Sequence, residues 1–105
     1  MVIEIIQQRV KDGNYLVKSH AFGHAIKEGF ERRQMTEAVL NGKIIEEYAN
    51  EERVLICGKA RLEKDVSIYL HIVCEYADAV YIEFVTAYIP DELEWNNPPF
   101  KRRRK

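Results

Sequence analysis

The sequence predicts an α+β domain, with N-terminal helices packed on one face of a twisted antiparallel sheet of about four strands. Two observations predict this class. The first 41 residues carry apolar side chains at helical spacing, interrupted by turn residues. The stretch from Arg53 to Ile89 is rich in β-branched and aromatic residues and is typical of three long strands in a meander. At 105 residues the chain has the size of one domain, which we expect to span residues 1–100.

Helices are expected over residues 2–11, 20–30 and 32–41, a short strand over 15–18, and a first long strand over 43–48. Ser19 is a good N-cap for the second helix. Its apolar side is expected to face the core and contains Phe22, Ala25, Ile26 and Gly29. Its other side is polar and contains His20, His24, Lys27 and Glu31. The two histidines therefore face solvent or a cleft beside the sheet. Trp95, after the last strand, is expected to pack back on the fold.

Charge is distributed unevenly along the chain. Lys101–Lys105 hold five of the sixteen basic residues, so the preceding residues carry eleven basic and seventeen acidic side chains, a net charge of −6. This excess of acid argues against a broad nucleic-acid-binding surface. Residues 101–105 are expected to form a basic, disordered tail.

A transmembrane helix needs about 20 consecutive apolar residues, and every apolar run in this sequence is much shorter. The first residues do not resemble a signal peptide. We therefore expect a cytoplasmic protein without membrane contact. In that compartment Cys57 and Cys74 are expected to be free thiols packed as small apolar groups.

Strand alternation separates the middle strand into two faces. Leu70, Ile72 and Cys74 share the apolar face, which the helices should cover. The other face is polar and is expected to hold Lys59, Arg61, Tyr69, His71, Glu75, Thr86 and Tyr88. These residues could form a site, or they could be the ordinary solvated face of an antiparallel sheet.

The register across this face depends on the two turns. A turn near Lys64 places His71 opposite Cys57. A turn at Ala77–Asp78 places Phe84 opposite His71 and Thr86 near Tyr69.

Five pieces of the sequence, taken in order and spacing, resemble the family called domain of unknown function 4258, over about residues 15–95. They are Ser19–Ala21, Leu40–Tyr48, Leu70–Val73, Val85–Asp91 and Trp95. The resemblance implies the small α+β fold of barnase, EndoU, colicin and RelE-type ribonucleases. It also implies a metal-independent, toxin-type ribonuclease, and it carries the family's recurring polar positions onto His20, His71, Thr86 and Tyr88.

Cleavage of RNA without a metal needs a base, an acid and a cation for the phosphorane charge. His71 and His20 could supply the base and the acid, because the pKa of histidine is near neutrality. Thr86 or Tyr88 could bind a phosphate. The expected substrate-binding residues are Lys59, Arg61, Tyr69 and His24, with Tyr69 stacking on a base. No cofactor is expected.

Two other functions remain open. His20 and His24 have the i, i+4 spacing of helical zinc ligands, and His71, Cys57 or Glu28 could complete a metal site. Alternatively, the domain could be a non-catalytic module that binds RNA or a protein such as a cognate antitoxin. An open edge strand could also pair two copies into a homodimer.

Overall fold

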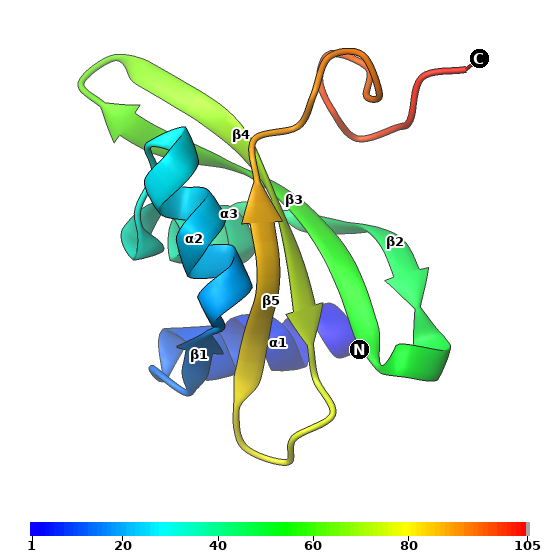
Figure 1. The fold of residues 1–105 in the computed structure, drawn as a ribbon. Helices are drawn as coiled ribbons and strands as arrows, with labels where there is room; N and C mark the ends of the chain where they lie inside the picture. Colours follow the sequence, from blue (N-terminus) through cyan, green and yellow to red (C-terminus); the bar gives the residue numbers. More distant parts are fainter. Residues whose placement is uncertain (105) are drawn as a thin grey trace.

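The computed structural model describes residues 1–104, and Lys105 lies outside the described residues. The predicted α+β class is confirmed: three helices pack with a five-stranded mixed sheet (Figure 1). The elements are α1 (Val2–Lys11), β1 (Tyr15–Val17), α2 (Ser19–Glu28), α3 (Arg32–Asn41), β2 (Lys43–Tyr48), a 3₁₀ turn (Ala49–Glu51), β3 (Arg53–Glu63), β4 (Val66–Glu75) and β5 (Ile82–Tyr88). Among residues 1–104, no helix combines the length and the apolar character needed to cross a membrane.

The strand order is β1-β5-β4-β3-β2. The last four strands form the expected antiparallel meander. The fifth strand is the short β1, which pairs in parallel with Ile82–Phe84 of β5 and makes the sheet mixed.

Helix α3 lies very close to one face of β3 and β4. The side chains on this face are apolar and buried, and they include Val54, Ile56, Leu70 and Ile72. Gly58 of β3 allows the close approach, because a Cβ atom at this position would lie 1.8 Å from the carbonyl oxygen of Ala38 in α3. Helix α1 packs beside α3 and adds Ile6 and Val10 to the same core.

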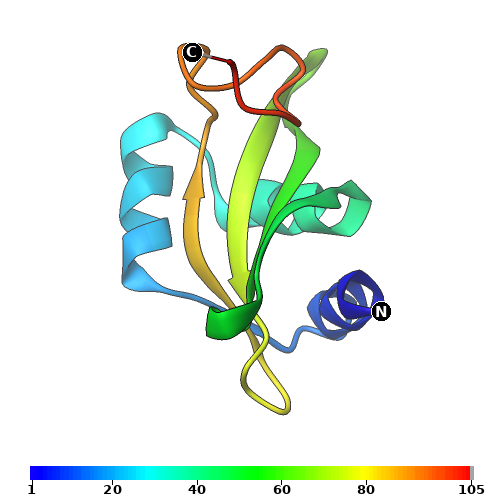
Figure 2. The ribbon, with the colours of Figure 1, turned by 90° about the vertical axis from the view of Figure 1, so that its right-hand side faces the viewer.

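Helix α2 packs against β5. Strand β1 pairs only with the first part of β5, Ile82–Phe84. A Glu28 carboxylate oxygen accepts the N–H of Ile89 at 2.9 Å, so the helix also provides a partner for a backbone group beyond the end of β5. Figure 2 shows α2 beside β5 on one side of the strands, with α1 and α3 on the other.

The prediction for the buried side of α2 is partly wrong. Ala21 and Ala25 are buried, whereas Phe22 is 56% exposed and Ile26 is 68% exposed. The helix period is as expected, but the small alanines, and not the large residues, face the strand.

Residues 90–104, which we call the C-terminal segment, fold back on themselves at the end of the sheet (Figure 1). Trp95 and Arg102 form an isolated β-bridge, and the N–H of Arg103 donates to the carbonyl of Glu94 at 2.8 Å. The Trp95 side chain is buried, which confirms that it packs back on the fold. The sequence predicts a disordered tail at 101–105; within that range, Arg102 lies over the Trp95 ring and bonds both carboxylate oxygens of Glu46, at 2.7 and 3.1 Å.

A candidate nucleic-acid interface

His71 occupies the centre of β4, on the face opposite α3. Its neighbour on β3 is Cys57, as predicted. Its neighbour on β5 is Tyr88, and the predicted Phe84 pairs instead with Cys74. The prediction fails because the connection spans residues 76–81 and a β-bulge follows it, which together shift the register.

Both ring nitrogens of His71 have partners. Nε2 lies 2.7 Å from the carbonyl oxygen of Pro99, and Nδ1 lies 3.2 Å from the Tyr88 hydroxyl. A carbonyl oxygen can only accept, so Nε2–H donates to Pro99. In the neutral ring Nδ1 then accepts from the Tyr88 hydroxyl. The Trp95 ring meets the imidazole edge-on, with ring centres 4.4 Å apart, and the His71 side chain is fully buried.

Burial favours the neutral form of this histidine. It lowers the pKa of His71, and this effect outweighs the Pro99 carbonyl and the Glu46 charge, which act in the opposite direction. Burial also raises the pKa of Tyr88 to about 12, so its hydroxyl stays protonated. At neutral pH, the two side chains therefore form an uncharged hydrogen-bonded pair beneath the C-terminal segment.

His20 and His24 lie elsewhere, on α2. Their ring centres are 4.8 Å apart, and Nδ1 of His24 pairs with Glu28 at 2.9 Å. They line an open hollow with Ser19, Gly23, Ile26 and Lys27. The structure does not bring His20 to His71, because His71 contacts the C-terminal segment and His20 contacts its own helix. Within residues 1–104, no three metal-ligating side chains gather in one place.

Thr86 and Tyr88 both belong to β5 and are half-buried. Thr86 lies opposite Val73, two pairs away from the pairing of His71 with Tyr88, and not near Tyr69 as the predicted turn would place it. Arg61 is exposed near the far end of β3, opposite Ser67, and its backbone N–H donates to the Glu37 carboxylate.

Four residues form what we call the basic-aromatic patch: Lys43, Lys59, Tyr69 and Phe100. The Lys59 ammonium lies 5.5 Å from the centre of the Tyr69 ring, and the Lys43 ammonium lies 4.6 Å from the centre of the Phe100 ring. The two rings meet edge-on, 5.5 Å apart. The patch borders an open hollow of about 250 Å³.

Two of these four residues, Lys59 and Tyr69, are among those predicted from the sequence. The other two were missed: Lys43, which starts β2, and Phe100, which the C-terminal segment carries to the sheet. The pairing of Lys43 with Cys57 follows from strand register and could have been found. The position of Phe100 depends on long-range packing and has no local signal.

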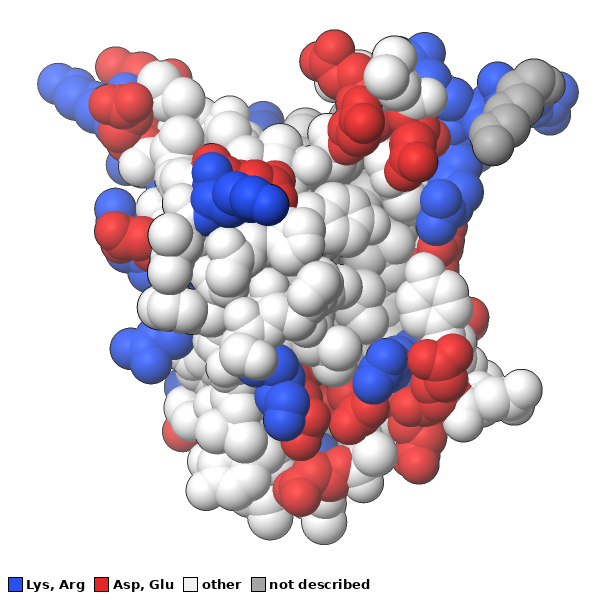
Figure 3. Space-filling model, viewed as in Figure 1, with Lys and Arg blue, Asp and Glu red and all other residues white. Residues whose placement is uncertain are grey.

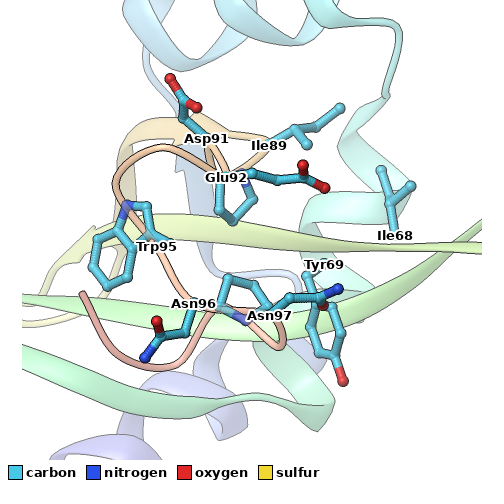
Figure 4. Close-up of a pocket in the computed structure, with 10 residues that line it drawn as sticks. Ile68, Tyr69, Ile89, Asp91, Glu92, Trp95, Asn96 and Asn97 are labelled. Carbon is cyan, nitrogen blue, oxygen red and sulfur yellow. The ribbon is translucent and has the colours of Figure 1, made fainter. Parts of the chain in front are cut away.

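Two further hollows adjoin the patch. Tyr69 also lines a pocket of about 150 Å³ between β4, the end of β5 and the C-terminal segment (Figure 4). Phe100 also lines a more open hollow that contains Lys101 and Arg103. Figure 3 shows acidic side chains gathered at the top of the view and basic ones beside them, toward the chain end. Acidic and basic side chains therefore lie side by side in this part of the surface.

The comparisons with known proteins concern the body of the domain. Residues 17–89 match the family described as Domain of unknown function (DUF4258). A search of curated proteins and a search of solved structures gave no match. The matched range includes His71 and Tyr88, whereas Trp95, Pro99 and Phe100 lie beyond it. Because the match covers well over half of the sequence, the chain belongs to the DUF4258 family.

Proposed function

We propose that this domain binds single-stranded RNA through the basic-aromatic patch and does not cleave it. The observation that carries the proposal is the alternation of two ammonium groups with two aromatic rings around one open hollow. Proteins that bind single strands combine positive charge for the phosphates with rings on which bases stack.

The local charge supports binding at this place in spite of the acidic body. Lys101 and Arg103 also line the hollow that Phe100 borders, and the Arg103 guanidinium donates to the carbonyl oxygen of Glu92. Interactions between exposed charges are largely screened beyond about 8–10 Å in physiological salt. A phosphate at the patch is therefore attracted mainly by the two ammonium groups that lie there, those of Lys43 and Lys59.

Cleavage is not part of the proposal, because within residues 1–104 the predicted acid–base pair, His20 and His71, is not brought together. His71 is fully buried and uses both ring nitrogens, and His20 lies on α2 without contact to it. A general base needs a free nitrogen within hydrogen-bond reach of the proton that it removes.

Binding can be tested by fluorescence anisotropy with a labelled, mixed-sequence 12-nucleotide RNA. We expect a dissociation constant of about 10⁻⁶–10⁻⁴ M at physiological salt, and an affinity that falls as salt is raised. The double variant Lys43→Ala/Lys59→Ala should bind more weakly, with a salt slope smaller by about 0.7 for each phosphate that the variant no longer neutralises.

The control is Lys11→Ala/Lys64→Ala, which removes the same charge from the end of α1 and from the β3–β4 turn. Equal weakening by both double variants, or no binding by the wild-type protein, would contradict the proposal. The RNA should also remain intact on a denaturing gel. Cleavage that disappears in His71→Ala would show that the domain is a nuclease.

A further inference from the structure

The pocket that shares Tyr69 with the basic-aromatic patch has a shape and a lining of its own. Its walls are mainly apolar and come from Ile68 and Tyr69 on β4 and from Ile89 at the end of β5. At about 150 Å³ it is smaller than the 300–1,000 Å³ of drug-sized sites, so it admits a single ring system. It adjoins the hollow that holds the two lysines of the patch, because Tyr69 lines both.

Two polar side chains face this pocket, and two others do not. In Figure 4 the Glu92 carboxylate extends toward the side on which Ile68 lies, and the Asn97 amide extends toward Tyr69. The Asp91 carboxylate and the Asn96 amide project away. Asp91 is also occupied, since its Oδ1 accepts the N–H of Leu93 at 2.8 Å.

The two inward groups define what a ligand must present. Carboxylate oxygens accept hydrogen bonds, so Glu92 favours a ligand that presents a hydrogen-bond donor, such as the N–H of an amino group. The Asn97 amide can donate to an acceptor beside that donor. Adenine and cytosine present this pair, an exocyclic amino group next to an acceptor ring nitrogen. Uracil instead presents a carbonyl oxygen where the amino group would be.

The charges near Tyr69 determine how a bound RNA strand is oriented across this ring. The hollow that Tyr69 shares with the patch is lined by Lys43 and Lys59, whereas the pocket that Tyr69 also lines carries the Glu92 carboxylate. A phosphate is attracted to the hollow and repelled by the pocket. The uncharged base is the part of a nucleotide that can enter the acidic pocket.

We propose that this pocket is a base-selective subsite for adenine or cytosine that disfavours uracil. The inference rests on the proposed binding of RNA and adds the class of base that the site takes. The backbone of the nucleotide remains at the basic-aromatic patch, and Glu92 and Asn97 read the edge of the base.

The test compares two pyrimidine 12-mers, C₁₂ and U₁₂, by anisotropy at pH 7.5. They have the same backbone and differ at the group that faces Glu92. We expect the wild-type protein to bind C₁₂ about five- to tenfold more tightly. Glu92→Gln should reduce this ratio to less than about twofold, because an amide can also donate to the uracil carbonyl.

Asp91→Asn is the matched control. It removes the same charge from the adjacent residue, keeps an acceptor for Leu93, and should leave the ratio unchanged. Equal affinity of the wild-type protein for both oligomers, or a ratio that Glu92→Gln and Asp91→Asn change alike, overturns the subsite while RNA binding stands. If neither oligomer binds, the proposed function fails and the subsite fails with it.

Discussion

Helix α3 covers one face of β3 and β4, and the C-terminal segment covers the other, by different means. On the α3 face the contacts are apolar and close enough that Gly58 has no room for a side chain. On the other face the contacts are hydrogen bonds and aromatic edges around His71, and ion pairing of Arg102 with Glu46.

This difference predicts two levels of stability in one small domain. The first face depends on a large buried apolar area that many residues share. The second depends on a few polar and aromatic contacts in the last 15 described residues, and segments with fewer apolar contacts open at lower free energy. The C-terminal segment should therefore loosen before the rest unfolds.

Gly58→Val should have the largest effect, because it attacks the closely packed face. The new side chain would displace α3 from β3, and we expect a loss of about 3 kcal/mol or more in the free energy of unfolding. Urea denaturation followed by circular dichroism measures it. Gly23→Ala on the exposed side of α2 is the control, with open space around the new Cβ and an expected gain of about 0.5–1 kcal/mol. Similar stability in both variants would contradict the packing described for α3.

His71→Ala should have an intermediate effect, confined first to the C-terminal segment. It leaves a cavity and removes the hydrogen bonds to Pro99 and Tyr88, at a cost of about 2–3 kcal/mol. Trp95 is the only tryptophan, so its fluorescence reports on this segment directly. The fluorescence transition in urea should precede the circular-dichroism transition in the variant. His20→Ala is the control, and it should change the free energy of unfolding measured by either probe by less than about 0.5 kcal/mol. If the fluorescence and circular-dichroism transitions of His71→Ala coincide, the two faces unfold as one.

Acidification should produce the smallest effect. Burial lowers the pKa of His71 below its usual 6.5, so the unfolded or released state binds the proton more readily. Stability of the segment is therefore complete above about pH 6.5 and is lost as pH falls through the pKa of the folded state. The other groups near the His71 ring keep their charge state between pH 7.5 and 5.5. Tyr88 stays protonated and Arg102 stays charged. Glu46 stays ionised, because Arg102 lowers its pKa below 4.5. The urea midpoint of Trp95 fluorescence should fall between pH 7.5 and 5.5, and His71→Ala should lack this fall.

The elements of the fold were predictable from the sequence, because local periodicity determines them. The helices, the meander and the pairing of His71 with Cys57 all follow from spacing and a short turn. The neighbour of His71 on β5 could not be predicted from the sequence, because one bulge changes which residue lies opposite His71. Periodicity also identified a helix at 19–28 but not its buried side, because Phe22 is more apolar than Ala21 although Ala21 fits closer to the strand.

The candidate site was less predictable. Alternation places Lys59 and Tyr69 on one face, but the covering of that face by Trp95, Pro99 and Phe100 depends on where a segment without repeating pattern returns. From the sequence, His71 could be an accessible reactive group or a satisfied one, and only the three-dimensional path of the chain separates these alternatives.

The position of the covering segment has a consequence for synthesis. A chain leaves the ribosome from its N-terminal end, and all five strands precede residue 90. Residues 90–104 are therefore the last of the described residues to become available for packing, and they close the sheet face that holds His71 and Tyr88.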